Sequence, residues 1–83
     1  MTAARLIRIQ YFAVLREQAG RSEEQIETAA ATPAELYEQV RTAHRFTLPR
    51  AMLRVAVNDE FCDWSTPLQP GDRVVFIPPV AGG

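Results

Sequence analysis

Apolar and polar positions alternate along residues 6–12, which is the period of a strand with one buried face. Arg8 and Gln10 lie on the polar side of this strand, and Phe12 falls on the same side. The opposite, apolar side carries Ile7, Ile9 and Tyr11. We therefore predict a half-buried strand here, with Phe12 either at its rim or in an exposed apolar patch.

The next stretch predicts a short helix followed by a second strand. In residues 13–19 apolar side chains recur one helical turn apart, and Gly20 is placed to end the helix in a left-handed conformation. A short strand is expected at residues 25–28, with Ile26 as its core residue.

The best-marked boundary in the chain is the start of a long helix. Thr32 suits the N-cap, Pro33 the first helical position, and Glu35 completes a capping box. Apolar residues then follow at helical spacing as far as about His44. The residues expected to face the core are Leu36, Val40 and Ala43, with Tyr37 beside them.

The second half of the chain predicts three short strands. Residues 53–58 alternate, Asn58-Asp59 forms a turn, and residues 60–63 can pair back against them. After a further turn at residues 69–72, residues 73–77 are almost continuously apolar, which is typical of a central strand buried on both faces.

The order of these elements indicates an α+β domain. We expect a mixed sheet of about five strands packed on one long helix, with a short helix in addition. The domain is expected to span residues 1–77, with an extended, flexible C-terminal tail at residues 78–83.

Composition narrows the class of protein. The 83 residues can bury a single small core, and a net charge of −1 argues against a nucleic-acid partner. No uninterrupted apolar segment suggests a signal peptide or a membrane span. The single cysteine, Cys62, cannot form an internal disulfide, which favours the cytoplasm. Cys62 and His44 stand in no nucleophilic or metal-binding pattern, so we expect neither a bound metal nor a catalytic constellation.

Chemistry is instead expected at the end of the sequence. Pro78 and Pro79 should end the last strand and project the following residues, Val80 and Ala81 first, as an extended arm. Gly82 and Gly83 add no side-chain width and would fit a slot that only backbone can enter. A Gly-Gly dipeptide alone would be a frayed terminus. Anchored to a central strand, it becomes the candidate site, with the Gly83 carboxylate as the reactive group.

A docking surface is expected on the face of the sheet that the long helix does not cover. The apolar side chains predicted there are Phe12, Val75 and Ile77. An apolar patch left open on a small protein usually marks a partner surface. The alternative is that a loop over residues 61–68 covers these side chains.

Three segments carry a resemblance to a known family: "YFAVLRE" after the first strand, "VAVN" in the third, and "PLQPGDRVVFIPPVAGG" at the end. Together they resemble the β-grasp, ubiquitin-like sulfur carriers, and among these the small subunits of molybdopterin synthase. The resemblance covers nearly the whole chain. It departs from the family at Ile77, where a second aromatic residue often precedes the two prolines.

The resemblance implies a reaction sequence at the tail. An activating enzyme that consumes ATP and magnesium would adenylate Gly83, which a sulfur donor would then convert to a thiocarboxylate. Gly82 would give the tail access to the pocket of a large subunit, where sulfur passes to cyclic pyranopterin monophosphate in molybdenum cofactor biosynthesis. The expected assembly is a heterotetramer, with Phe12, Val75, Ile77 and residues 78–81 contacting the partner.

Three other functions remain open at this point. A ubiquitin-like modifier, or a carrier for the thiamine or cysteine pathway, would share the fold and the terminus. An ordinary interaction domain would have no terminal chemistry, and a residue added after Gly83 would then change nothing.

Overall fold

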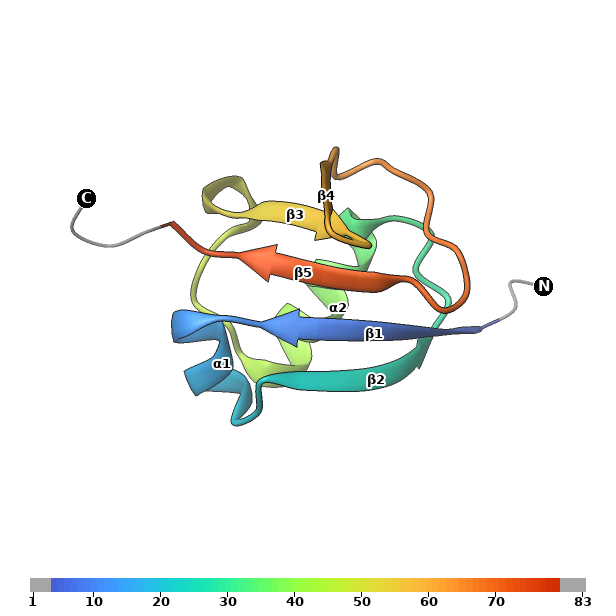
Figure 1. Ribbon diagram of the computed structural model, residues 1–83. Helices are drawn as coiled ribbons and strands as arrows, with labels where there is room; N and C mark the ends of the chain where they lie inside the picture. Colours follow the sequence, from blue (N-terminus) through green and yellow to red (C-terminus); the bar gives the residue numbers. More distant parts are fainter. Residues whose placement is uncertain (1–3, 80–83) are drawn as a thin grey trace.

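The computed structural model describes residues 4–79 and places a five-stranded mixed sheet against one long helix (Figure 1). The elements in chain order are β1 (Arg5–Tyr11), α1 (Ala13–Ala19), β2 (Glu23–Thr28), α2 (Pro33–His44), the 3-10 helix η1 (Arg50–Met52), β3 (Arg54–Val57), β4 (Glu60–Cys62) and β5 (Arg73–Ile77). The strand order is β2-β1-β5-β3-β4, with β1 and β5 parallel and the other neighbours antiparallel. The α+β class and the five strands with two α-helices are confirmed.

The last strand is central, as its apolar sequence predicted. β5 lies between β1 and β3, with Phe76 opposite Tyr11 on one side and Val55 on the other. Because β1 and β5 run in parallel, both end at the same end of the molecule, beside α1 (Figure 1). The tail therefore follows the strand that is held by neighbours on both sides.

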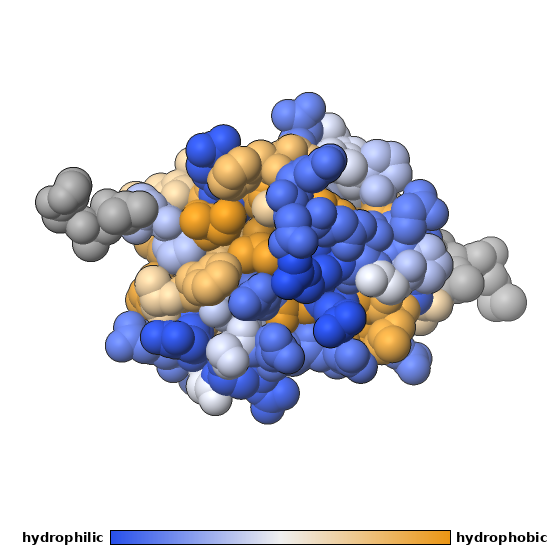
Figure 2. Space-filling model, viewed as in Figure 1, coloured by the Kyte–Doolittle hydropathy of each residue, from blue (hydrophilic) through white to orange (hydrophobic). Residues whose placement is uncertain are grey.

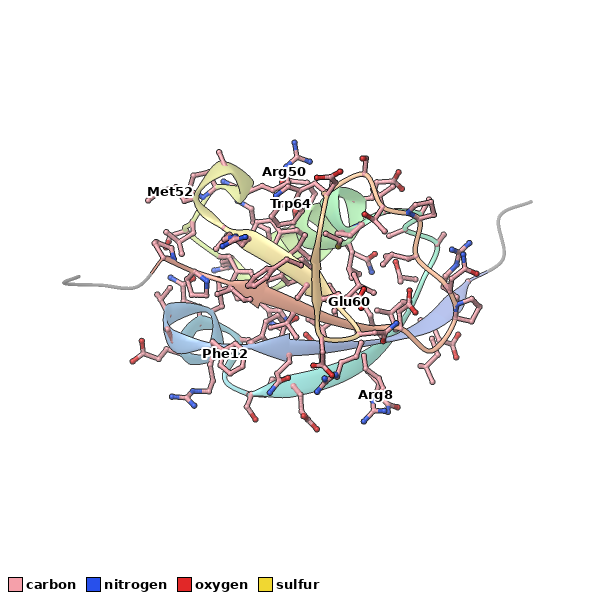
Figure 3. The ribbon with its side chains drawn as sticks, turned by 45° about the horizontal axis from the view of Figure 1, so that its top comes forward. Arg8, Phe12, Arg50, Met52, Glu60 and Trp64 are labelled. Atoms are coloured by element: carbon pink, nitrogen blue, oxygen red, sulfur yellow. The ribbon has the colours of Figure 1, made fainter. Side chains whose placement is uncertain are left out.

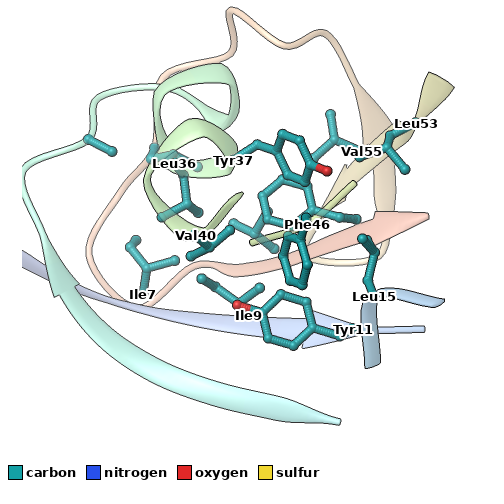
Figure 4. Close-up of a cluster of buried hydrophobic side chains, with 14 residues drawn as sticks. Ile7, Ile9, Tyr11, Leu15, Leu36, Tyr37, Val40, Phe46, Leu53 and Val55 are labelled. Carbon is teal, nitrogen blue, oxygen red and sulfur yellow. The ribbon is translucent and has the colours of Figure 1, made fainter. Parts of the chain in front are cut away.

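The core lies between the sheet and α2 and is rich in aromatic rings (Figure 4). Tyr37 of α2 is fully buried, stacks on Phe46 and meets Phe76 and Trp64 edge to face. Such ring pairs add specific geometry to the apolar burial that stabilises the domain. The Tyr37 hydroxyl donates to the Leu48 carbonyl at 2.6 Å, so its polar end is satisfied in the core.

Both predicted helix boundaries are confirmed by their caps. Thr32 Oγ1 accepts from the Glu35 amide at 3.3 Å, while Glu35 Oε1 accepts from the Ala31 amide at 3.1 Å. The carboxylate thus reaches one residue further back than in the usual capping box. At the end of α1, Gly20 has φ 76°, the left-handed conformation that its position predicted.

Some details differ from the sequence prediction. Ala43 is exposed and Tyr37 fully buried, because the buried arc of α2 is rotated toward Tyr37 and His44. β2 begins at Glu23 rather than at residue 25, since pairing with β1 extends to Gln10 opposite Glu23. Phe12 has left the strand and is the N-cap residue of α1.

Candidate tail and docking site

The tail begins at the end of β5, where Ile77 is half-buried, Pro78 is buried and Pro79 is exposed. The first proline is therefore part of the packed domain, and the chain reaches the surface at the second. The predicted site residues Val80, Ala81, Gly82 and Gly83 lie outside the residues that the structure describes.

The face of the sheet opposite α2 carries the predicted docking residues. Strand register aligns four residues in a row across this face: Gln10, Val75, Ala56 and Phe61. Directly paired residues point to the same side of a sheet, and Val75 alternates with core residues, so the row faces away from α2. Figure 2 shows apolar residues gathered on this face around the end of β5, with polar residues across its middle.

Val75 lies on the face opposite α2, as predicted, but the expectation that it is exposed there is wrong. Its side chain is 7% exposed, because Val75 sits on the central strand between Gln10 and Ala56. Phe12 is 43% exposed, which agrees with the sequence prediction for that residue. Of the three predicted docking residues, Phe12 and Ile77 are therefore accessible to a partner, and Val75 is not.

Sequence reasoning missed two residues of this face, Phe61 and Arg54. Phe61 of β4 is 60% exposed, more than any other large apolar side chain among residues 4–79. Arg54 of β3 is paired with Ile77 of β5, and its guanidinium carbon lies 4.1 Å from the centroid of the Phe61 ring. The parity of β3 and β4 would have placed both residues on this face, had their register been known.

Figure 3 shows where the labelled side chains lie along the molecule. Phe12 and Met52 project at the end where β5 stops, and Arg8 lies toward the opposite end. Met52 is 53% exposed. Exposed apolar side chains therefore surround the point where the tail leaves the domain.

A separate cluster of titratable groups lies under the β1–β2 edge. The Tyr11 hydroxyl and His44 Nε2 both bond to Glu24 Oε2, the latter at 2.6 Å, and Arg21 Nη1 lies 3.8 Å from Glu24 Oε1. Burial alone would raise the pKa of Glu24. The hydrogen bonds from Tyr11 and His44, with the charges of His44 and Arg21, outweigh burial and hold that pKa below its ordinary value.

This cluster has a structural role. Burial raises the pKa of Tyr11 far above its ordinary value, and the Glu24 carboxylate raises it further, so Tyr11 stays a neutral donor. His44, which the sequence placed at the end of the helix, joins that end to β2 through Glu24. Cys62 is a partly buried free thiol packed against the core, as expected of a small packing residue.

Within residues 4–79, no group of three or more His, Cys, Asp or Glu side chains lies close enough to hold a metal ion. Over the same residues, no helix has the length and apolar character needed to cross a membrane.

The fold defines the class of this protein, a ubiquitin-like β-grasp domain. The model of the ThiS family matches residues 9–83, and the chain belongs to that family. By family and by fold, it is therefore a ThiS-like sulfur carrier.

Solved structures agree with this assignment. A Pyrococcus furiosus protein described as molybdopterin converting factor, subunit 1, is 30% identical, with a TM-score of 0.77 over 92% of this chain and 99% of that one. Haloferax volcanii SAMP1 superposes with a TM-score of 0.79 at 24% identity, covering 94% and 99% of the two chains. A Helicobacter pylori chain, from a complex of subunits 1 and 2 of molybdopterin-converting factor, gives 0.66 at 24% identity, covering 94% and 99%. The last two likenesses concern the fold.

Proposed function

We propose that this protein is the sulfur-carrier subunit of a molybdopterin synthase. The observation that carries the proposal is the direct connection of the central strand β5, through Pro78 and Pro79, to the Gly82-Gly83 pair, which lies within the match to the family model. The 30% identity to the Pyrococcus furiosus protein supports the choice of pathway among ThiS-type carriers.

The chemistry of the carrier resides at the Gly83 carboxylate. A carboxylate is a poor acyl donor because its leaving group would be an oxide. Its oxygen attacks the α-phosphate of ATP on the activating enzyme, pyrophosphate leaves, and magnesium offsets the phosphate charge. Hydrosulfide supplied by a sulfur donor then attacks the carbonyl carbon and displaces AMP, and loss of the sulfur-bound proton leaves a thiocarboxylate.

The rest of the chain docks and presents the tail. Gly82 and Gly83 enter the pocket of the large subunit, where the thiocarboxylate transfers its sulfur to cyclic pyranopterin monophosphate. Phe12 and Ile77 contact the large subunit, and residues 78–81 line the entry. Since a dithiolene needs two sulfur atoms, two charged carriers serve each product, in a heterotetramer with a large-subunit dimer.

Intact-mass measurement tests this function. We expect the chain, incubated with its activating enzyme, ATP, magnesium and a sulfur donor, to exchange one terminal oxygen for sulfur. The matched control carries one extra residue after Gly83 and should stay unchanged. A terminal carboxylate that persists while the enzyme consumes ATP would contradict the proposal.

A protein modifier is the second candidate, favoured by the likeness in fold to SAMP1, whose full name is small archaeal modifier protein 1. It predicts a different product in the same experiment. An isopeptide bond between Gly83 and a lysine of another protein would increase the mass by that of the acceptor. Transfer of sulfur to the pterin precursor in the presence of the large subunit, without such adducts, supports the carrier.

A further inference from the structure

Arg54 stands at the point where the tail leaves the sheet. It is the first residue of β3 and pairs directly with Ile77, the last residue of β5. Its side chain is exposed, and its guanidinium lies over one face of the Phe61 ring, 4.1 Å from the centroid. The geometry fits a cation–π contact, which holds the guanidinium against the most exposed apolar side chain of this face.

The charge of Arg54 is not balanced within residues 4–79. None of the ion pairs in this part of the chain includes Arg54. Arg73, which lies on the same face of the sheet, differs because it forms an ion pair with Asp59. Arg54 is therefore an exposed cation that forms no ion pair within residues 4–79 and has Phe61 and Ile77 as apolar neighbours.

A partner that covers Phe61 also removes water from the Arg54 guanidinium. Because the guanidinium lies on the ring, a partner that packs against Phe61 also covers much of Arg54. A buried charge without a partner is costly, while a guanidinium can donate two parallel N–H bonds from its edge to one carboxylate. A partner surface that is apolar throughout would thus bind less favourably at this position.

We propose that Arg54 determines partner specificity by requiring a carboxylate beside the apolar contact for Phe61. The partner is the large subunit that receives the tail, so the inference rests on the proposed function. In the complex, the carboxylate accepts from the edge of the guanidinium and Phe61 fills an apolar site next to it. The carboxylate contact forms beside Ile77, the residue that precedes Pro78.

Calorimetric titration of the carrier with the large subunit tests this inference. Arg54→Gln removes the charge, and we expect Kd to rise about 30-fold or more, as for loss of one member of a buried ion pair. Arg54→Lys keeps the charge without the planar fork and should recover only part of the affinity. The matched control is Arg8→Gln, an exposed arginine on the same face but away from the tail, which should change Kd less than about twofold.

The outcomes separate this inference from the proposed function. All variants are first checked for an unchanged thermal melt. If wild type binds and forms the thiocarboxylate but Arg54→Gln binds like Arg8→Gln, or more tightly, the role of Arg54 is refuted and the carrier function stands. If wild type forms the thiocarboxylate and does not bind the large subunit, both the partner and the role of Arg54 are refuted.

Discussion

Replacing Glu24 with glutamine should destabilise the domain, because this carboxylate holds together three elements. Its Oε2 accepts from Tyr11 of β1 and from His44 at the end of α2, while Glu24 itself belongs to β2. The Tyr11 side chain is fully buried, and that of Glu24 is 11% exposed. A glutamine oxygen can accept one of these two bonds well, and its NH2 group then faces the other donor.

The size of the effect follows from these contacts. Weakening two bonds to a charged acceptor, with one buried donor left without a partner, costs about 2 kcal/mol in the free energy of unfolding. For a domain of this size, the melting temperature should fall by about 10 °C. The matched control is Glu23→Gln. Glu23 is an exposed neighbour on β2 whose side chain forms no hydrogen bond or ion pair within residues 4–79, so this variant should change the melting temperature by less than about 2 °C.

The loss of stability in Glu24→Gln should also depend on pH. Because the pKa of Glu24 is lowered in the folded state, its stabilisation is fully present above the unfolded-state pKa and is lost as the pH falls through the folded-state pKa. Denaturant unfolding followed by circular dichroism, from about pH 5 down to about pH 2, should show Glu24→Gln approaching wild type in acid. A deficit that stays constant across this range, or one that Glu23→Gln shares, would refute the reasoning.

Three further predictions concern single positions. Thr32→Ala removes the N-cap acceptor of α2 and should cost about 1 kcal/mol in the free energy of unfolding. The control Thr42→Ala, at an exposed position in the last turn of the same helix, should change the free energy of unfolding by less than about 0.5 kcal/mol; equal denaturation curves for the two variants would contradict the capping role. Gly20→Ala should cost about 1 kcal/mol from its positive φ alone, since nothing lies within 4 Å of the added Cβ, and an unchanged melt would show that the turn relaxes. Phe12→Arg should abolish co-purification with the large subunit while the chain stays folded. The control Leu6→Arg lies at the other end of β1, has a similar exposure of 46%, and should leave co-purification unchanged. The same behaviour in both variants would exclude docking through Phe12.

Local signals in the sequence were sufficient for most elements of this fold. The capping residues Thr32 and Glu35 marked the start of α2, and Gly20 marked the end of α1, because such signals act within one turn of the chain. The apolar run of β5 predicted a central strand, because a strand with a neighbour on each side has little contact with water. The prolines and glycines that follow β5 predicted where chemistry would reside, and that assignment stays a proposal.

Tertiary structure decided which side chains share a surface. Only the register of β3 with β4 and β5 brings Arg54 next to Ile77 on one side and to the Phe61 ring on the other. The burial of Val75 has the same origin, since alternation predicts the face of a strand but not what its neighbours cover. Contacts between residues far apart in sequence depend on how strands pair and twist, and no local pattern encodes that pairing. Local patterns in the sequence thus predicted the helices, the strands and the residues of the tail. Strand pairing decided which side chains surround the end of β5.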